Sequence, residues 1–172
     1  MDRLQRISAH ITALNGRIGV AVSWLTLAMV AAYFLVVLLR YLFSAGSIAL
    51  QESVTYMHAT VFMLAAAWTL ARDGHVRVDI FHSRWDGRAK SWVDLAGSLL
   101  FLLPMAVFIF AASIGFVAES WRVRETSAQP GGLPFVYLLK LLLLVMPAQL
   151  VLQALAQAVM AAGRLSGTAR SE

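Results

Sequence analysis

The sequence has few charged residues for its length. Asp, Glu, Lys and Arg make up 13% of the 172 residues, whereas hydrophobic residues make up 60%. A typical soluble domain has about 25% charged and roughly 45–50% apolar residues. A water-soluble chain of this size could not bury so much apolar surface, and a disordered chain would have the opposite composition. The shortage of charge therefore predicts an integral membrane protein.

Cysteine is absent, which excludes disulfides, thiolate metal sites and iron–sulfur clusters. The sequence also contains no nucleophile–base pattern, phosphate-binding loop or metal-binding cluster. We therefore predict no catalytic, metal-binding or substrate-binding residue, no cofactor in this chain and no enzymatic activity. The net charge of +5 fits basic residues that flank membrane spans and contact anionic lipids, so lipids rather than nucleic acids are the expected contacts.

Four long apolar runs are present, and each has the length of a helix that crosses a bilayer. The runs are continuously apolar rather than alternating, which argues against a β-barrel. The sequence thus predicts an all-α membrane protein with one four-helix domain over residues 1–172. The expected spans are residues 18–41, 52–71, 95–118 and 134–162.

The basic residues are distributed unevenly between the two sides of these spans. With four spans, the termini and the middle loop lie on one side, and that side carries ten of the 14 Lys and Arg residues. The positive-inside rule then places both termini in the cytoplasm and the 44–51 and 119–134 loops outside.

Two segments are predicted to lie along the membrane surface as amphipathic helices, residues 3–16 and 80–92. Each has an apolar stripe at helical spacing with basic residues beside it. The first could instead extend the first span into the cytoplasm. The predicted membrane-interface anchors are Leu4, Ile7, Ile11, Leu14, Phe81, Trp85 and Trp92.

A few polar residues lie in or next to the predicted spans. Arg40 and Glu52 flank a short loop, where they could pair with each other or contact an external partner. His58 is the only histidine inside a span, and haem ligation is disfavoured because the other spans offer no second histidine. A hydrogen bond from His58 to a neighbouring helix is the favoured alternative.

Gln149, Gln153 and Gln157 are four residues apart and share one face of the fourth span. Because unsatisfied amides are costly in lipid, this face should contact protein, either within this chain or in a partner. The 119–134 loop is more ionic than a minimal connection requires. Its residues Arg122, Arg124 and Glu125 are candidate docking contacts.

Two stretches resemble the small membrane subunit (DctQ-like) of TRAP transporters, the tripartite ATP-independent periplasmic carriers. The first comprises QESVTY at residues 51–56, AAAW at 65–68 and DGHVRVD at 73–79. The second comprises SWRVRE at 120–125, GGLP at 131–134 and Lys140, and is similar to the mannitol/chloroaromatic branch, which includes keto-acid carriers. The family-motif residues are Gln51, Glu52, Gly74, His75, Arg77 and Asp79.

This resemblance implies a sodium-driven importer of an organic acid that needs three proteins and is located in the bacterial inner membrane. A periplasmic binding protein captures the substrate and docks on the outer face, and a large elevator-type membrane subunit moves it. The small subunit supports the large one as a scaffold and binds neither substrate nor sodium. The partner interface would then include Arg40, Glu52, His58, Arg122, Arg124, Glu125, Gln149, Gln153 and Gln157. Two alternatives are a self-sufficient homo-oligomeric transporter or channel, suggested by the polar face of the fourth span, and a membrane redox subunit, suggested by His58.

Overall fold

The computed structural model describes residues 2–72, 74 and 85–168. The described residues form helices α1 (Asp2–Phe43), α2 (Ile48–Ala71), α4 (Gly87–Ala96), a π-helical segment η1 (Gly97–Leu102), α5 (Leu103–Arg122) and α6 (Val136–Thr168). Among these residues no strand occurs, and four helical stretches are long and apolar enough to cross a membrane. The predicted all-α class with four spans is confirmed.

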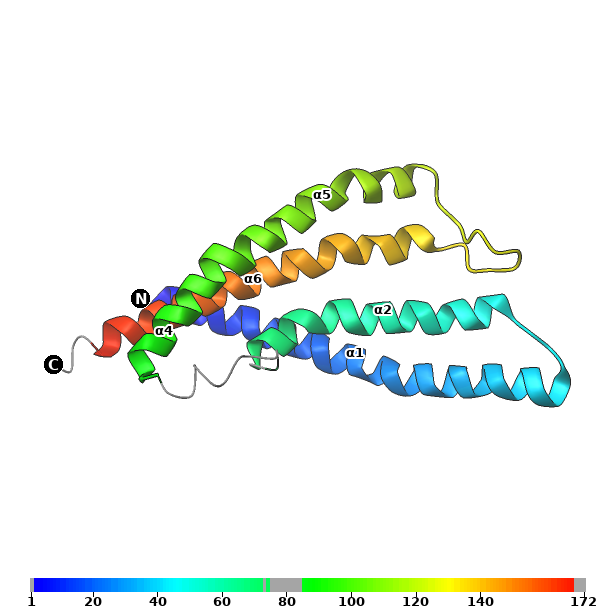
Figure 1. The fold of residues 1–172 in the computed structure, drawn as a ribbon, viewed down its shortest axis with the longest axis horizontal. Helices are drawn as coiled ribbons and strands as arrows, with labels where there is room; N and C mark the ends of the chain where they lie inside the picture. Colours follow the sequence, from blue (N-terminus) through cyan, green and yellow to red (C-terminus); the bar gives the residue numbers. More distant parts are fainter. Residues whose placement is uncertain (1, 73, 75–84, 169–172) are drawn as a thin grey trace.

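The helices run up and down along one long axis (Figure 1). Both termini and α4 lie at one end, which we call the terminal end. The connections at residues 44–47 and 123–135 lie at the other end, which we call the loop end. This arrangement agrees with the predicted four-span layout, in which both termini share a side with the middle connection.

Helices α1 and α2 form an antiparallel hairpin that is held by a close contact. Gly19 of α1 lies so near Trp68 of α2 that a methyl group at this position would overlap the indole ring. At the loop end, Ser47 caps α2 by accepting a hydrogen bond of 3.3 Å from the Leu50 backbone N–H. Such a cap satisfies one of the free amide groups at a helix start.

The third span is a continuous helical stretch made of α4, η1 and α5. Asp86 caps its start by accepting a hydrogen bond of 2.9 Å from the Ala89 backbone N–H. The π-helical segment η1 lies directly before Pro104 in the first turn of α5. Because proline has no N–H group to donate, a local π-turn beside it accommodates the interrupted hydrogen-bond pattern.

Helix α6 is the central element of the fold, because it contacts α1, α2, α4, η1 and α5. Its buried side chains are mostly small: Ala154, Ala156, Ala158 and Ala161. Small residues let helix backbones approach closely, which is the usual packing mode when lipid rather than water surrounds the helices. Pro147 is also fully buried inside α6.

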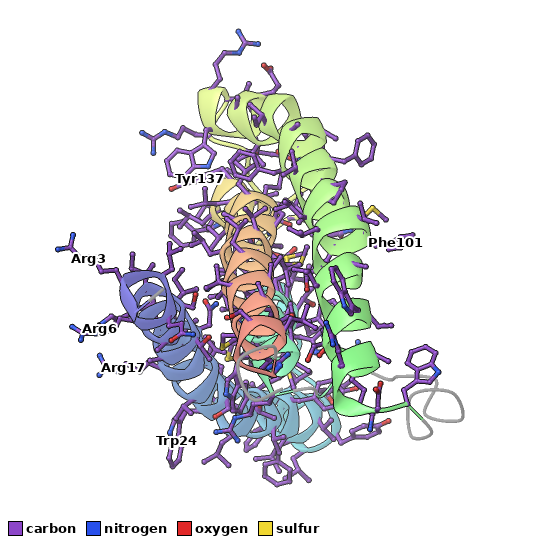
Figure 2. The ribbon with its side chains drawn as sticks, turned by 90° about the vertical axis from the view of Figure 1, so that its left-hand side faces the viewer. Arg3, Arg6, Arg17, Trp24, Phe101 and Tyr137 are labelled. Atoms are coloured by element: carbon purple, nitrogen blue, oxygen red, sulfur yellow. The ribbon has the colours of Figure 1, made fainter. Side chains whose placement is uncertain are left out.

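The side chains that point away from the bundle are mainly large and apolar. Figure 2 shows Trp24 and Phe101 directed outward, and these side chains are 70% and 76% exposed. The polar residues Ser8 and Asn15, by contrast, are buried. This reversal of the soluble-protein pattern is expected of helices that face lipid.

The predicted N-terminal surface helix at residues 3–16 is not a separate element. It forms the first part of α1, which is one helix of 42 residues. At 1.5 Å per residue such a helix is about 63 Å long, well beyond a hydrocarbon core of about 30 Å. The second predicted surface helix, residues 80–92, overlaps the start of α4, and its residues 80–84 lie outside the described residues.

Candidate functional site: the Glu52 clasp and the polar contacts of α6

Glu52, in the first turns of α2, holds the loop between α5 and α6. Its carboxylate accepts one hydrogen bond from the Ser127 hydroxyl and another, of 2.6 Å, from the Leu133 backbone N–H. The Ser127 N–H in turn donates to the Leu133 carbonyl at 3.1 Å. We call Glu52, Ser127, Gly132 and Leu133 the Glu52 clasp. It joins segments that are far apart in sequence into one surface at the loop end.

Glycine is required where the loop meets the carboxylate. Gly131 has φ 78°, in the left-handed region that favours glycine. A Cβ atom at Gly132 would overlap the Ser127 side chain and come within 2.7 Å of a Glu52 carboxylate oxygen. The turn at residues 131–134 can therefore approach Glu52 only because Gly132 has no side chain.

A second set of charged contacts supports the same loop. The Lys140 ammonium group lies 2.5 Å from the Glu125 carboxylate and 3.9 Å from the Phe116 ring centroid. The Lys140 ammonium group holds the pKa of Glu125 below its usual range. Nearby, the Arg124 guanidinium lies 5.5 Å from the Tyr137 ring. These contacts tie both ends of the loop to α5 and α6.

Arg40 and Glu52, which could have paired, do not pair in the structure. Arg40 is exposed in the last turn of α1, and the described residues show no ion pair between it and Glu52. Arg122 forms an exposed pair with Glu119, one helical turn earlier, at 2.6 Å. Of the predicted contact residues at the loop end, Arg40, Arg122 and Arg124 remain exposed. Glu52 and Glu125 instead form a hydrogen bond and an ion pair within the chain.

The glutamines of α6 contact this chain and not open surface. Gln153 is fully buried; it accepts a hydrogen bond of 2.9 Å from the Asn15 amide and donates one of 3.3 Å to the Thr12 hydroxyl. Gln157 donates to the Leu70 carbonyl at 3.0 Å. Gln149 is 8% exposed. Gln153 and Gln157 thus bond to α1 and α2, which is the within-chain alternative that the sequence left open for this face.

The partner of Gln153 was not among the residues predicted from the sequence. Ser8, Thr12 and Asn15 recur at helical spacing, and that spacing was the available signal. Each follows a residue of the apolar stripe of the N-terminal segment directly, so it lies about 100° around the helix from that stripe. At the same end, the Arg164 guanidinium lies 3.3 Å from the Asp94 carboxylate, which links α6 to α4. The polar side chains at the terminal end thus join α1, α2, α4 and α6.

His58 lies on the exposed face of α2, together with Gln51 and Thr55. The predicted anchors Leu4, Ile7 and Leu14 are exposed on α1, while Ile11 is half-buried. Trp85 and Trp92 are also exposed, near the start of α4. Gly74 is exposed. The anchor Phe81 and the motif residues His75, Arg77 and Asp79 lie outside the described residues.

The described residues contain no group of three or more His, Cys, Asp or Glu side chains that could hold a metal ion. The polar contacts instead join helices to one another and a loop to a helix. Their chemistry is therefore structural, and the surfaces that they shape are the candidates for function.

Comparison with known proteins identifies one matching family. The family model described as "Tripartite ATP-independent periplasmic transporters, DctQ component" matches residues 29–164. That match covers α2, the α5–α6 loop and most of α6. Neither the curated proteins nor the solved structures yield a match.

Proposed function

Because this chain belongs to the DctQ component family of TRAP transporters, we propose that it is the scaffold subunit of a sodium-driven organic-acid importer. The family consists of transporter components rather than enzymes, and tripartite transporters include a large membrane component and a binding protein. In this proposal the small subunit supports the elevator-type large subunit in the membrane. Substrate and sodium bind elsewhere in the complex.

The use of polar side chains inside the bundle is the observation that supports a scaffold role. Asn15 and Gln153 are buried and hydrogen-bonded to each other, and Gln157 is bonded to a backbone carbonyl. Polar groups that line a transport path must exchange partners with a passing solute. Groups that are committed to one another across helices instead hold those helices in fixed positions, as a static support requires.

The orientation that we propose places the loop end in the periplasm. Ten of the 14 basic residues belong to the termini and the middle connection, which supports a cytoplasmic terminal end. The Glu52 clasp and the exposed Arg40, Arg122 and Arg124 would then face the docking binding protein. A single cysteine can test this, since the chain has none of its own.

Gly46 and Gly87 form a matched pair for that orientation test. Both have open space around the position of an added side chain, and they lie at the loop end and the terminal end respectively. In intact spheroplasts, a membrane-impermeant maleimide should label Gly46→Cys and should not label Gly87→Cys until the membrane is opened. The reverse labelling would overturn the proposed orientation.

Reconstitution into liposomes tests the scaffold function itself. Uptake of a labelled short-chain 2-oxo acid should require the large component, this chain, the binding protein and an inward sodium gradient together. Flux from this chain alone would contradict the proposal and support a self-sufficient homo-oligomeric transporter. A Soret absorption band in the purified complex would instead support the redox-subunit alternative.

A further inference from the structure

One face of α2 carries polar side chains on the outside of the bundle. The exposed residues of α2 recur at intervals of three and four: Ile48, Gln51, Thr55, His58 and Phe62. This spacing places them in a single row along the helix. We call Gln51, Thr55, His58 and Phe62 the α2 stripe. Three of its four members are polar.

The stripe reaches well into the membrane. His58 lies six residues after Glu52 and fourteen before Arg72, the charged residues that bracket this span. At 1.5 Å per residue these intervals are about 9 Å and about 21 Å along the helix axis. A hydrocarbon core is about 30 Å thick, so His58 lies within it and not at its edge.

The polar groups of the stripe find no partner among the described residues of this chain. Other hydroxyl side chains of α2 donate to backbone carbonyls, at 2.7 Å for Ser53 and 2.8 Å for Thr60. Neither Thr55 nor His58 forms such a bond within the part of the chain that the structure describes. Because an unsatisfied polar group in lipid is costly, this face calls for a hydrogen-bonding neighbour.

The surface of η1 and α5 has a different character. Every exposed residue between positions 99 and 118, in η1 and α5, is apolar or small. Phe101, Met105 and Phe108 are each at least 60% exposed there. That surface is suited to lipid, whereas the polar side chains of the α2 stripe favour contact with protein.

An apolar groove lies beside the stripe, between α1 and α2. It has a volume of about 430 Å³ and is lined by Met29, Val30, Tyr33, Phe34, Val37 and Val54. Val54 follows Gln51 by three residues and precedes His58 by four, so it is a neighbour of both on the helix surface. Stripe and groove therefore form one continuous surface that offers hydrogen bonds and room for apolar side chains.

We propose that the α2 stripe and this groove receive a membrane-spanning helix of the large component, with a hydrogen-bonding side chain at the depth of His58. The inference rests on the proposed function, which supplies the partner. Interhelical hydrogen bonds in membranes are modest but specific, so His58 fixes the depth and rotation of the incoming helix while the groove provides contact area.

Two phenylalanines allow a matched crosslinking test in the assembled complex. Phe62 of the stripe and Phe108 of α5 are 69% and 68% exposed, and each lies near the middle of its span. p-Benzoylphenylalanine carries an added benzoyl group, and both positions are exposed enough to hold this larger side chain. Illumination of native membranes should yield an adduct with the large component from position 62 and none from position 108. An adduct from position 108 only, an adduct with a second copy of this chain, or no adduct at 62 would overturn the proposal.

Variants of His58 test the hydrogen bond. His58→Leu should lower the amount of large component that co-purifies by about 3- to 20-fold, the range that interhelical hydrogen bonds span. His58→Gln, which keeps donor and acceptor groups, should retain most of it, as should the control Phe108→Leu. The yield and melting temperature of the chain itself are measured alongside to exclude loss of folding. An unchanged complex yield with His58→Leu would overturn the proposal.

The same experiments separate this inference from the proposed function. If the unmodified chain fails to co-purify with any large component, the scaffold function itself is wrong. If it co-purifies but position 62 forms no adduct, the function stands and only the assigned face is wrong.

Discussion

The Glu52 carboxylate accepts a hydrogen bond of 2.6 Å from the backbone N–H of Leu133, a residue 81 positions later in the chain. Together with the Ser127 hydroxyl, this contact fastens the α5–α6 loop to the start of α2. Glu52 is a family-motif residue at the boundary of a span. Its carboxylate is hydrogen-bonded to the loop and is not paired with Arg40. The position of the α5–α6 loop therefore depends on the Glu52 carboxylate.

We expect Glu52→Ala to free the loop while leaving membrane insertion intact. The Leu133 N–H loses its acceptor, so its hydrogen exchange should accelerate strongly in the purified protein. Glu119→Ala, which removes an exposed carboxylate at the same end, is the control and should leave Leu133 unaffected. Equal exchange at Leu133 in both variants would show that the clasp does not hold the loop.

Gly132→Ala should disturb the same loop without removing any charge. The added methyl group meets Ser127 and the Glu52 carboxylate, so the turn must move away from α2. Limited proteolysis should then cleave the 123–135 segment faster than in the unmodified protein. Gly46→Ala in the other loop-end connection meets nothing within 4 Å and should leave the cleavage rate unchanged.

The contact between Gly19 and Trp68 makes a stability prediction for the α1–α2 hairpin. Gly19→Ala should destabilise the protein by about 1–3 kcal/mol, because the methyl group overlaps the indole ring and forces the helices apart. Gly115→Ala, in the open surface of α5, should be neutral or stabilising by up to about 1 kcal/mol. Thermal unfolding in detergent measures both. Similar melting temperatures for the two variants would contradict the close packing of α1 on α2.

The buried amide pair of Asn15 and Gln153 should show energetic coupling. Replacing either residue with leucine leaves the other amide buried without its partner, at a cost of about 1–3 kcal/mol. The double variant removes both amides and should cost less than the sum of the single variants. A double-mutant cycle from unfolding data gives the coupling, expected near 0.6–2 kcal/mol from transmembrane hydrogen bonds. Strict additivity would show that the two amides do not interact.

The ion pair of Glu125 and Lys140 predicts a pH dependence of the loop. The lowered pKa of Glu125 means that the folded protein favours the ionised carboxylate. The ion pair therefore contributes fully to stability above the ordinary glutamate pKa of about 4.3. This contribution is lost as the pH falls through the lowered pKa that Glu125 has in the folded protein. Loop protection should decline across that acidic window. Glu125→Gln should remove this part of the pH dependence, and an identical profile for both proteins would exclude the ion pair as its cause.

Much of the fold could be predicted because the signal is local. A continuous run of apolar residues without charge forms a helix in lipid wherever it lies in the chain, since a helix satisfies the backbone hydrogen bonds within the run itself. The predicted span at residues 52–71 accordingly falls inside α2, Ile48–Ala71. The ends were less predictable, because α1 and the 87–122 stretch continue as helix past the apolar runs.

The polar residues were predictable as a set but not as contacts. Sequence spacing shows that the α6 glutamines share a face, and it leaves open whether that face meets this chain or a partner. Only the tertiary structure brings Asn15 of α1 to Gln153, 138 residues away. Helical spacing cannot supply such a pairing, because it depends on how the helices pack and not on the sequence of either helix.

The sequence by itself determined that this protein is a four-span membrane protein with a basic side, because hydropathy and charge act locally along the chain. The tertiary structure decided which polar groups are hydrogen-bonded within the chain and which remain exposed. It assigned Glu52 to the loop and Gln153 to α1, and it left His58 exposed at membrane depth. These outcomes follow from long-range packing, in which one helix face can be covered only when another helix lies against it.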